Sequence, residues 1–314
     1  MKNNYAYNHK PINFDFKQTI DRFFVEEIPL YKPTNSGNFL ILKIKKQDMS
    51  SWKLVTVIAK ATGLKERDIG YAGLKDKSAT TIQYISIPKN VEKSLNKNLT
   101  TPKVEILERY YSKAPIKIGQ LKGNRFVIKL HNVSTKDALD IQNIANKLSK
   151  NGIPNYFGYQ RFGEDYNFQR AKDVVYGEEV ITNKKVEHLL ISAYQSYFFN
   201  SWLSKRVELS KEKNLNKLEV LDGDLFFDKN KKIITGLLPG RKVKRSTSKA
   251  YEIEKEFDDE YVYAKGYRRE AWVKVSNIKN KYNKEKEELV LEFDLPKGSY
   301  ATVVIENIAN ANFK

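Results

Sequence analysis

Apolar and polar residues alternate along several short stretches of the chain, and this pattern predicts β-strands. The alternation is clearest near the C-terminus, where Leu289, Leu291, Phe293 and Leu295 occupy every second position. Residues two apart in a strand point to the same face, so these four side chains are expected to face a core. Further strands are expected at 39–44, 81–87, 104–107, 125–130 and 272–275, and residues 14–27 are expected to be extended.

Three other stretches repeat apolar residues every three or four positions, which is typical of helices packed against a core. The first is capped by Ser50 or Ser51, both good capping residues, and ends before Gly63. The second runs from Ser134 to Asn151. The third, 186–203, is apolar almost all round and is therefore expected to be a central buried helix.

Polar segments separate these elements and are expected to be loops. Residues 90–101 predict a surface loop, 210–218 a charged break and 277–287 a charged turn. Asp222-Gly223-Asp224 lies between two apolar runs and predicts a strand-turn-strand hairpin over 220–227. Strands interspersed with a few helices place the chain in the α+β class.

Length and composition restrict the possible chemistry. The 314 residues suit two domains, or one domain with a large insertion. The chain has no cysteine, and His9, His131 and His188 show no metal-ligand spacing, so neither a thiol nucleophile nor a metal site is expected. No apolar run approaches the roughly 18 residues of a membrane span, and the N-terminus lacks the apolar segment of a signal peptide. We therefore expect a cytoplasmic protein that is not attached to a membrane and, by default, is a monomer.

The charge balance points to an anionic partner. Lys and Arg number 56 against 38 Asp and Glu, which gives a formal net charge of +18. Lys, Asn and Ile are all abundant, and the biased genome composition that this indicates would supply part of the lysine excess. Nucleic acid is the leading partner on these grounds and a membrane surface is second.

One segment places a single acid between two cations on a glycine-containing loop. In Gly70-Tyr71-Ala72-Gly73-Leu74-Lys75-Asp76-Lys77, the carboxylate of Asp76 precedes a β-branched run that predicts a strand. Flanking lysines keep a carboxylate ionised, and an ionised, positioned aspartate can act as a nucleophile or as a base. A turn with all three charges in solvent explains the same spacing, and these residues alone favour that simpler interpretation.

A second segment alternates aromatic side chains with amide and guanidinium groups. It reads Asn155-Tyr156-Phe157-Gly158-Tyr159-Gln160-Arg161-Phe162-Gly163. These groups can stack on a nucleobase and hydrogen-bond to its edges or to phosphates. A buried aromatic loop with one structural arginine is an equally good interpretation.

Three rival functions can be weighed against these segments. A phosphate-binding P-loop ending at Lys77-Ser78 fails, because Tyr71 and Asp76 occupy the two positions that must be glycine. A metal-dependent nuclease using Asp222, Asp224 and Asp228 is less economical than a hairpin turn, and chelator would abolish its activity. A non-catalytic RNA-binding protein explains the charge and the aromatics but not Asp76, and full function of an Asp76→Ala variant would favour it.

The segments 70–77, 155–163 and 298–302 (Gly298-Ser299-Tyr300-Ala301-Thr302) resemble signature stretches of the TruD family of tRNA pseudouridine synthases, in the family's order. Residues 23–27 and the turn at 238–240 are also similar to the family. The resemblance spans nearly the whole chain. It departs at Arg22, where the family usually has Asp, and in a middle region that is shorter than usual.

The resemblance implies a pseudouridine synthase core, with a mainly antiparallel sheet and flanking helices, formed by residues 1–180 and 267–314. An inserted, family-specific α/β domain, the TRUD domain, would occupy 181–266. The implied reaction is the isomerisation of uridine, at position 13 of tRNA, to pseudouridine. The family needs no cofactor and no metal, so neither is expected here.

The resemblance also implies roles for single residues. Asp76 would be the catalytic carboxylate, with Lys17 as its basic partner and Lys75 or Lys77 as substitutes. Phe157 would stack on the uracil, and the Asn155 amide would position Asp76 or the base. In supporting positions, Gln160 and Arg161 would brace the loop of Asn155, while Ser299 and Tyr300 would form either the active-site wall or, more simply, part of the core. The basic run Arg241 to Arg245 would contact phosphates.

Overall fold

The computed structural model describes residues 3–30, 34–75, 77–163, 168–228, 230 and 233–313, which fold into two compact units. We call them the sheet unit, residues 13–139 and 276–298, and the helical unit, residues 1–12, 140–275 and 299–314. Each unit is therefore assembled from segments that lie far apart in the sequence.

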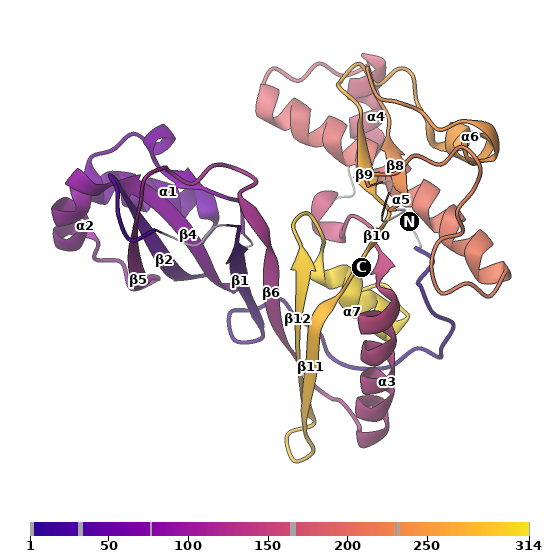
Figure 1. The fold of residues 1–314 in the computed structure, drawn as a ribbon, viewed down its shortest axis with the longest axis horizontal. Coiled ribbons are helices and arrows are strands. Elements are labelled where there is room, and N and C mark those ends of the chain that lie inside the picture. The colour runs from indigo at the N-terminus through magenta and orange to yellow at the C-terminus, as the bar shows by residue number, and fades with distance from the viewer. Residues whose placement is uncertain are drawn as a thin grey trace. The chain divides into compact units, whose positions relative to one another are not determined.

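An eight-stranded sheet forms the centre of the sheet unit (Figure 1). Its strands are β1 (Phe23–Pro29), β2 (Phe39–Gln47), β3 (Gly70–Tyr71), β4 (Thr80–Pro88), β5 (Val104–Ser112), β6 (Leu121–Leu130), β11 (Ser276–Asn283) and β12 (Glu288–Pro296). They follow the order β11-β12-β6-β1-β4-β2-β5, and β3 pairs with β4. In the described part of this sheet, neighbouring strands are antiparallel except β1 and β4, which are parallel. The predicted α+β class with a mainly antiparallel sheet is confirmed.

The predicted strand near the C-terminus is β12, which lies beside β6. Phe293 pairs with Phe126 and Leu291 with Ile128, and the two phenylalanine rings stack 5.6 Å apart. Both β12 residues are fully buried. The alternating pattern therefore identified the buried face correctly, while the partner strand lies more than 150 residues earlier in the chain.

Helices α1 (Ser51–Thr62) and α2 (Glu92–Asn98) share a core with β2 and β4. Ser50 accepts a hydrogen bond from the Lys53 N–H, and Gly63 ends α1 in a left-handed conformation, as predicted. The loop expected at 90–101 is wrong, because α2 forms there and buries Leu95 completely. A helix of two turns with one buried leucine has too little apolar repetition to be recognised from sequence.

The charged turn expected at 277–287 is also wrong over most of its length. Residues Ser276–Asn283 form β11, an edge strand paired with β12, and the turn is confined to 284–287. Half-buried and exposed residues alternate along β11, so the strand lacks the apolar face that would have predicted it.

The helical unit contains five helices in its described part and two small sheets. Its elements are most of α3 (Thr135–Asn151), β7 (Ile153–Pro154), α4 (Phe168–Tyr176), α5 (Lys184–Glu212), β8 (Thr235–Leu238), α6 (Ser248–Glu254), β9 (Tyr267–Glu270), β10 (Trp272–Val273) and α7 (Ala301–Ala309). β7 pairs with β10, and β8 pairs with β9. Single 3₁₀ turns lie at Glu66–Asp68 and Lys89–Val91 in the sheet unit and at Tyr159–Arg161 and Lys255–Phe257 in the helical unit.

Helix α5 is the predicted central helix, and it is longer than expected. It buries Phe199, Trp202 and Leu203, and it extends into the first three residues of the predicted break, to Glu212; the rest of that break, 213–218, is non-helical as predicted. Leu189, near its start, is 62% exposed, so the first turns of α5 are not buried on every face as the sequence predicted.

The hairpin expected at 220–227 does not form as two paired strands. Asp222 and Gly223 do lie in a turn, but in this segment only Phe226 makes a β-bridge, to Ile234. The carboxylate of Asp224 instead forms a bidentate pair with Arg206 of α5, with both side chains 2% exposed. The segment is thus attached to α5 by an ion pair and not by strand pairing, and the local sequence does not predict that ion pair.

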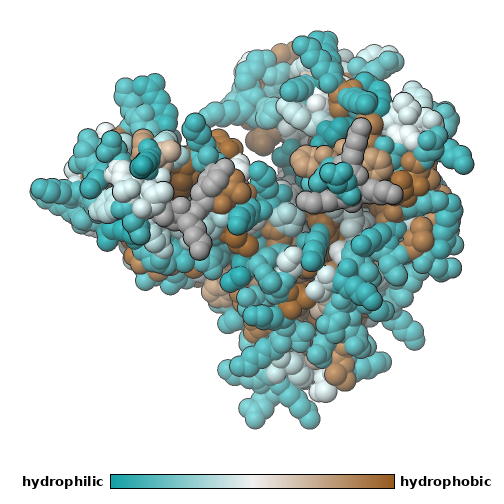
Figure 2. Space-filling view, in the orientation of Figure 1, coloured by the Kyte–Doolittle hydropathy of each residue, from teal (hydrophilic) through white to brown (hydrophobic). Residues whose placement is uncertain are grey.

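Among the described residues, we find no helix long and apolar enough to cross a membrane. Hydrophilic residues cover most of the face seen in Figure 2, with apolar residues scattered among them. This surface agrees with the high charge content of the sequence.

Candidate active site

The segment with the predicted catalytic carboxylate connects β3 to β4 in the sheet unit. Asp76 itself lies outside the described residues. Gly70 begins the segment at a position where a Cβ atom would lie 2.3 Å from the backbone oxygen of Ile116 and 2.3 Å from Ser86 Oγ. A glycine is therefore required for the chain to pass this close to its neighbours.

Lys75, directly before Asp76, is held by a buried ion pair. Its Nζ lies 2.9 Å from Oε2 of Glu27 on β1, and the two side chains are 4% and 2% exposed. Burial raises the pKa of Glu27, while the charge of Lys75 acts in the opposite direction. Lys75 was a candidate for the basic partner of Asp76, and the structure shows that its ammonium group already contacts the carboxylate of Glu27.

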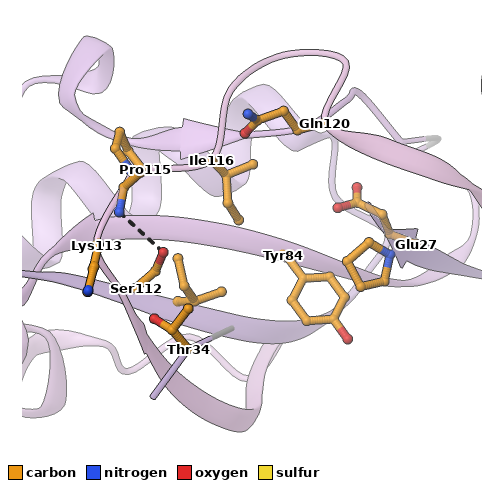
Figure 3. A pocket seen from close by; sticks show the side chains of 11 residues that line it. Glu27, Thr34, Tyr84, Ser112, Lys113, Pro115, Ile116 and Gln120 are labelled. Atoms are coloured by element: carbon orange, nitrogen blue, oxygen red, sulfur yellow. Dashed lines mark hydrogen bonds between the residues drawn. The ribbon is translucent and has the colours of Figure 1, made fainter. Parts of the chain in front are cut away.

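Glu27 also lines a cavity of about 530 Å³ in the sheet unit. Figure 3 shows Glu27 and Tyr84 toward one end of this cavity and Ser112 and Lys113 toward the other. Glu27 thus both lines this cavity and pairs with Lys75, the residue directly before Asp76 in the sequence.

The other two candidate lysines of the sheet unit are exposed. Lys17 is 64% exposed and lies 3.6 Å from Asp15, which also pairs with Arg22 at 2.8 Å. Lys77 is exposed as well. Solvent-exposed pairs of this kind contribute little stability, so the Lys17 ammonium group can readily exchange partners.

In the helical unit, Phe157 lies at the centre of the predicted aromatic segment. Its side chain is buried and packs edge-to-face against Phe199 at 5.6 Å and against Tyr300 at 6.0 Å between ring centres. Its backbone is held from both sides by Asn200, whose amide oxygen accepts from the Phe157 N–H and whose NH₂ donates to the Phe157 carbonyl. These contacts fix the orientation of the ring.

Arg269 of β9 covers Phe157, a contact that no motif of the sequence indicates. The guanidinium carbon lies 4.0 Å from the centre of the Phe157 ring, a cation–π contact. The same guanidinium donates to the backbone oxygen of Asn155 at 3.1 Å and to its amide oxygen at 2.8 Å. Burial, together with the nearby charge of Arg161, lowers the pKa of Arg269 to about 10. The only available signal was the pair Arg268-Arg269 in a short segment between two apolar stretches.

The Asn155 amide is occupied on both sides. Its oxygen accepts from Arg269, and its NH₂ donates to the backbone oxygen of Glu270 at 2.9 Å. Within the helical unit, Asn155 therefore holds Arg269 over Phe157. Its predicted contact with Asp76, which lies outside the described residues, or with the base stays a prediction.

The supporting residues of the segment reach other helices. Arg161 donates to Ser196 of α5 and lies 5.5 Å from the Phe157 ring centre, while Gln160 accepts from Thr302 of α7. Tyr300 packs against Phe157, and Ser299 Oγ is buried without a hydrogen bond to the described part of the chain. The structure therefore brings Asn155, Phe157, Gln160, Arg161 and Tyr300 together in the helical unit, and Lys75 with Glu27 in the sheet unit.

The acidic residues of the rival nuclease interpretation do not form such a group. Asp224 is engaged with Arg206, and Asp228 Oδ1 accepts from the Asn230 N–H. Across the residues that the structure describes, no three His, Cys, Asp or Glu side chains are grouped so that they could hold a metal ion.

A family model matches nearly the whole chain. The model is described as tRNA pseudouridine synthase D (TruD), and it matches residues 2–183 and 166–308.

Individual relatives match with equal coverage. The tRNA pseudouridine synthase D of Nitratiruptor sp. is 42% identical over 98% of this chain and 98% of its own length, and that of Wolinella succinogenes is 38% identical over 100% and 99%. Among solved structures, the crystal structure of the putative tRNA pseudouridine synthase D from Methanosarcina mazei matches with a TM-score of 0.72, covering 99% of this chain and 96% of that one. At 22% identity, this last match shows that the fold is shared.

Proposed function

The chain belongs to the TruD family of tRNA pseudouridine synthases, and we propose that it isomerises uridine to pseudouridine in tRNA with Asp76 as the catalytic carboxylate. The observation that carries this function is the match to family members along the full length of the chain. We further propose position 13 of tRNA as the target, as the family resemblance implies.

The reaction rearranges one nucleotide and leaves its composition unchanged. The bond between ribose C1′ and uracil N1 breaks, the uracil turns, and a bond forms between C1′ and C5. The proton on C5 is lost and N1 gains one, so no oxidant or reductant is needed. Asp76 starts the sequence either as a nucleophile or as the base that removes a sugar proton.

Phe157 of the helical unit is our candidate for the aromatic side chain that receives the uracil. A uridine within a stem must first leave the stack, at a cost of a few kcal/mol. We propose that the flipped-out uracil stacks on Phe157, whose backbone is held by Asn200 and whose ring packs against Phe199 and Tyr300. Stacking on an aromatic side chain contributes about 1–3 kcal/mol per base and offsets much of that cost.

Positive charge supports binding of the tRNA backbone. In the basic run 241–245, Arg241, Lys242 and Lys244 are exposed, whereas Arg245 pairs with Asp258. Exposed cations of this kind contact phosphates and position the RNA without reading its sequence. Lys17, exposed and only loosely paired, stays our candidate for the basic partner of Asp76.

Several finer expectations stay predictions. The TRUD domain is proposed to span 181–266, all of which lies in the helical unit. We propose that the enzyme acts as a monomer in the cytoplasm, where it meets tRNA, and that the reaction needs neither cofactor nor metal.

The catalytic assignment is tested by replacing Asp76 with Asn, which removes the charge at nearly constant shape. We expect pseudouridine formation in unmodified tRNA to fall by at least about 10³-fold while tRNA affinity stays within a few fold, because a nucleophile or base is lost. Asp222→Asn is the matched control and should turn over normally, also in EDTA. Turnover by Asp76→Asn at the wild-type rate would refute the assignment, and loss of activity in Asp222→Asn or in EDTA would favour a metal-dependent mechanism.

A further inference from the structure

Lys75 directly precedes Asp76 in the sequence, and burying its ammonium group carries a large desolvation cost. Its ammonium group and the carboxylate of Glu27 are both withdrawn from water, with a separation of 2.9 Å. A buried ion pair contributes little net stability compared with apolar residues of similar size, but it fixes its two partners in one arrangement. The pair is therefore better explained by what it positions than by stability.

The backbone of Lys75 is held as well. Its N–H donates to Ser51 Oγ at 2.9 Å, and Ser51 Oγ in turn donates to Gln83 Oε1 at 2.9 Å. Ser51 is the first residue of α1 and Gln83 lies on β4, and both are buried. Lys75 thus contacts β1 through its side chain and α1 through its backbone, and Ser51 of α1 links it in turn to β4.

We propose that Glu27 is a positioning residue of the reaction, which together with Ser51 holds Lys75, the residue directly before Asp76 in the sequence, in one arrangement. The proposal rests on the assignment of Asp76 under Proposed function. One peptide unit separates the fixed Cα of Lys75 from that of Asp76, so a change in Lys75 is transmitted directly. A displacement of about 1 Å at a reacting group can cost about 10²-fold in rate.

An alternative role for Lys75 predicts a different outcome. If Lys75 acted as the free cation that keeps Asp76 ionised, removing its counter-charge in Glu27→Gln would preserve or increase the rate. If Glu27 and Lys75 act as one positioning unit, Glu27→Gln and Lys75→Met should each reduce the rate, and the double variant should be no slower than the slower single variant.

The experiment measures single-turnover pseudouridine formation on unmodified tRNA by the full chain, with tRNA affinity and thermal unfolding measured alongside. We expect both single variants to lose about 10²-fold in rate, with affinity unchanged within about twofold and with no further loss in the double variant. Lys75→Arg should recover part of the rate, because it keeps the charge. Asp224→Asn is the matched control, since the Arg206–Asp224 pair of the helical unit is buried to the same extent, and it should lose stability while keeping the rate.

A wild-type rate in Glu27→Gln would overturn the proposal, and so would an equal loss of rate in Asp224→Asn. If Glu27→Gln fails to fold, Ser51→Ala provides the second test, because it removes the hydrogen bonds of Ser51 Oγ to the Lys75 backbone and to Gln83 while leaving the Glu27–Lys75 ion pair in place. Its rate should fall roughly fivefold, the worth of the one hydrogen bond to Lys75, and an unchanged rate would refute the proposal. Failure of the Asp76 assignment is seen separately, as turnover by Asp76→Asn.

Discussion

The guanidinium of Arg269 lies 4.0 Å above the ring of Phe157 and is held there by two hydrogen bonds to Asn155. This relationship joins β9 to the aromatic segment, although the two residues are 112 positions apart in the sequence. It gives Asn155 a defined task within the helical unit. It also leaves a cation, largely removed from water, beside the surface proposed to receive the uracil.

Replacing Arg269 with Lys should impair catalysis although the charge is kept. Lysine lacks the planar fork that lies on the ring while donating to both oxygens of Asn155. We expect a loss of about tenfold in single-turnover rate, corresponding to the weakening of these hydrogen bonds. Arg268→Lys is the control, because Arg268 pairs with Glu254 and does not contact Phe157. Equal losses in the two variants would show that the effect is a general one on the unit.

Replacing Phe157 should separate stacking from space filling. Phe157→Ala removes the aromatic surface and should lower the rate of pseudouridine formation by at least about tenfold, whereas Phe157→Tyr keeps a ring and should lose much less. Rates and tRNA affinities of both variants decide the matter. Similar behaviour of the two variants would contradict a stacking role.

Adding one methyl group at Gly158 should disturb the same surface. A Cβ there would lie 2.7 Å from Thr302 Oγ1 and 2.9 Å from Tyr300 Cδ1, closer than real contacts allow. Because Thr302 is fully buried, the strain should shift Tyr300 against Phe157. We expect Gly158→Ala to lower the free energy of unfolding by about 1–3 kcal/mol and to lower turnover. Gly163→Ala is unsuitable as a comparison because φ there is +74°, so Gly73→Ala, with no contact under 3.4 Å, is the control for the free energy of unfolding alone, since Gly73 lies in the segment that carries Asp76. Unchanged stability in Gly158→Ala, measured by urea denaturation, would show that the neighbours adapt.

Glu306 should make stability depend on pH. Burial raises its pKa from 4.5 to about 7. Between these values the folded protein keeps a proton that the unfolded chain has lost, so the free energy of unfolding falls as pH rises through this window, by about 3 kcal/mol for this group. Urea denaturation at pH 5 and at pH 8 should show a smaller fall in Glu306→Gln than in the unsubstituted protein. Exposed Glu285→Gln serves as the control, and an equal fall in all three proteins would contradict the prediction.

Local patterns predicted much of the secondary structure. Helix α1 begins and ends at the residues that capping rules indicate, and β12 buries the face that its alternation predicts. These elements could be predicted because their signals lie within a few neighbouring residues. Helix α2 and strand β11 were missed because each buries too few apolar side chains to create a pattern.

The sequence by itself determined the α+β class, the family and the candidate residues Asp76 and Phe157, through motifs that are contiguous in the chain. Only the tertiary structure placed Arg269 on Phe157, Glu27 on Lys75 and Arg206 on Asp224. In each of these cases a charged residue meets its partner across a long stretch of chain or on a different element. Such a side chain reads as exposed in the sequence, because pairing and burial of a charge depend on which elements pack together, and local periodicity carries no record of that packing.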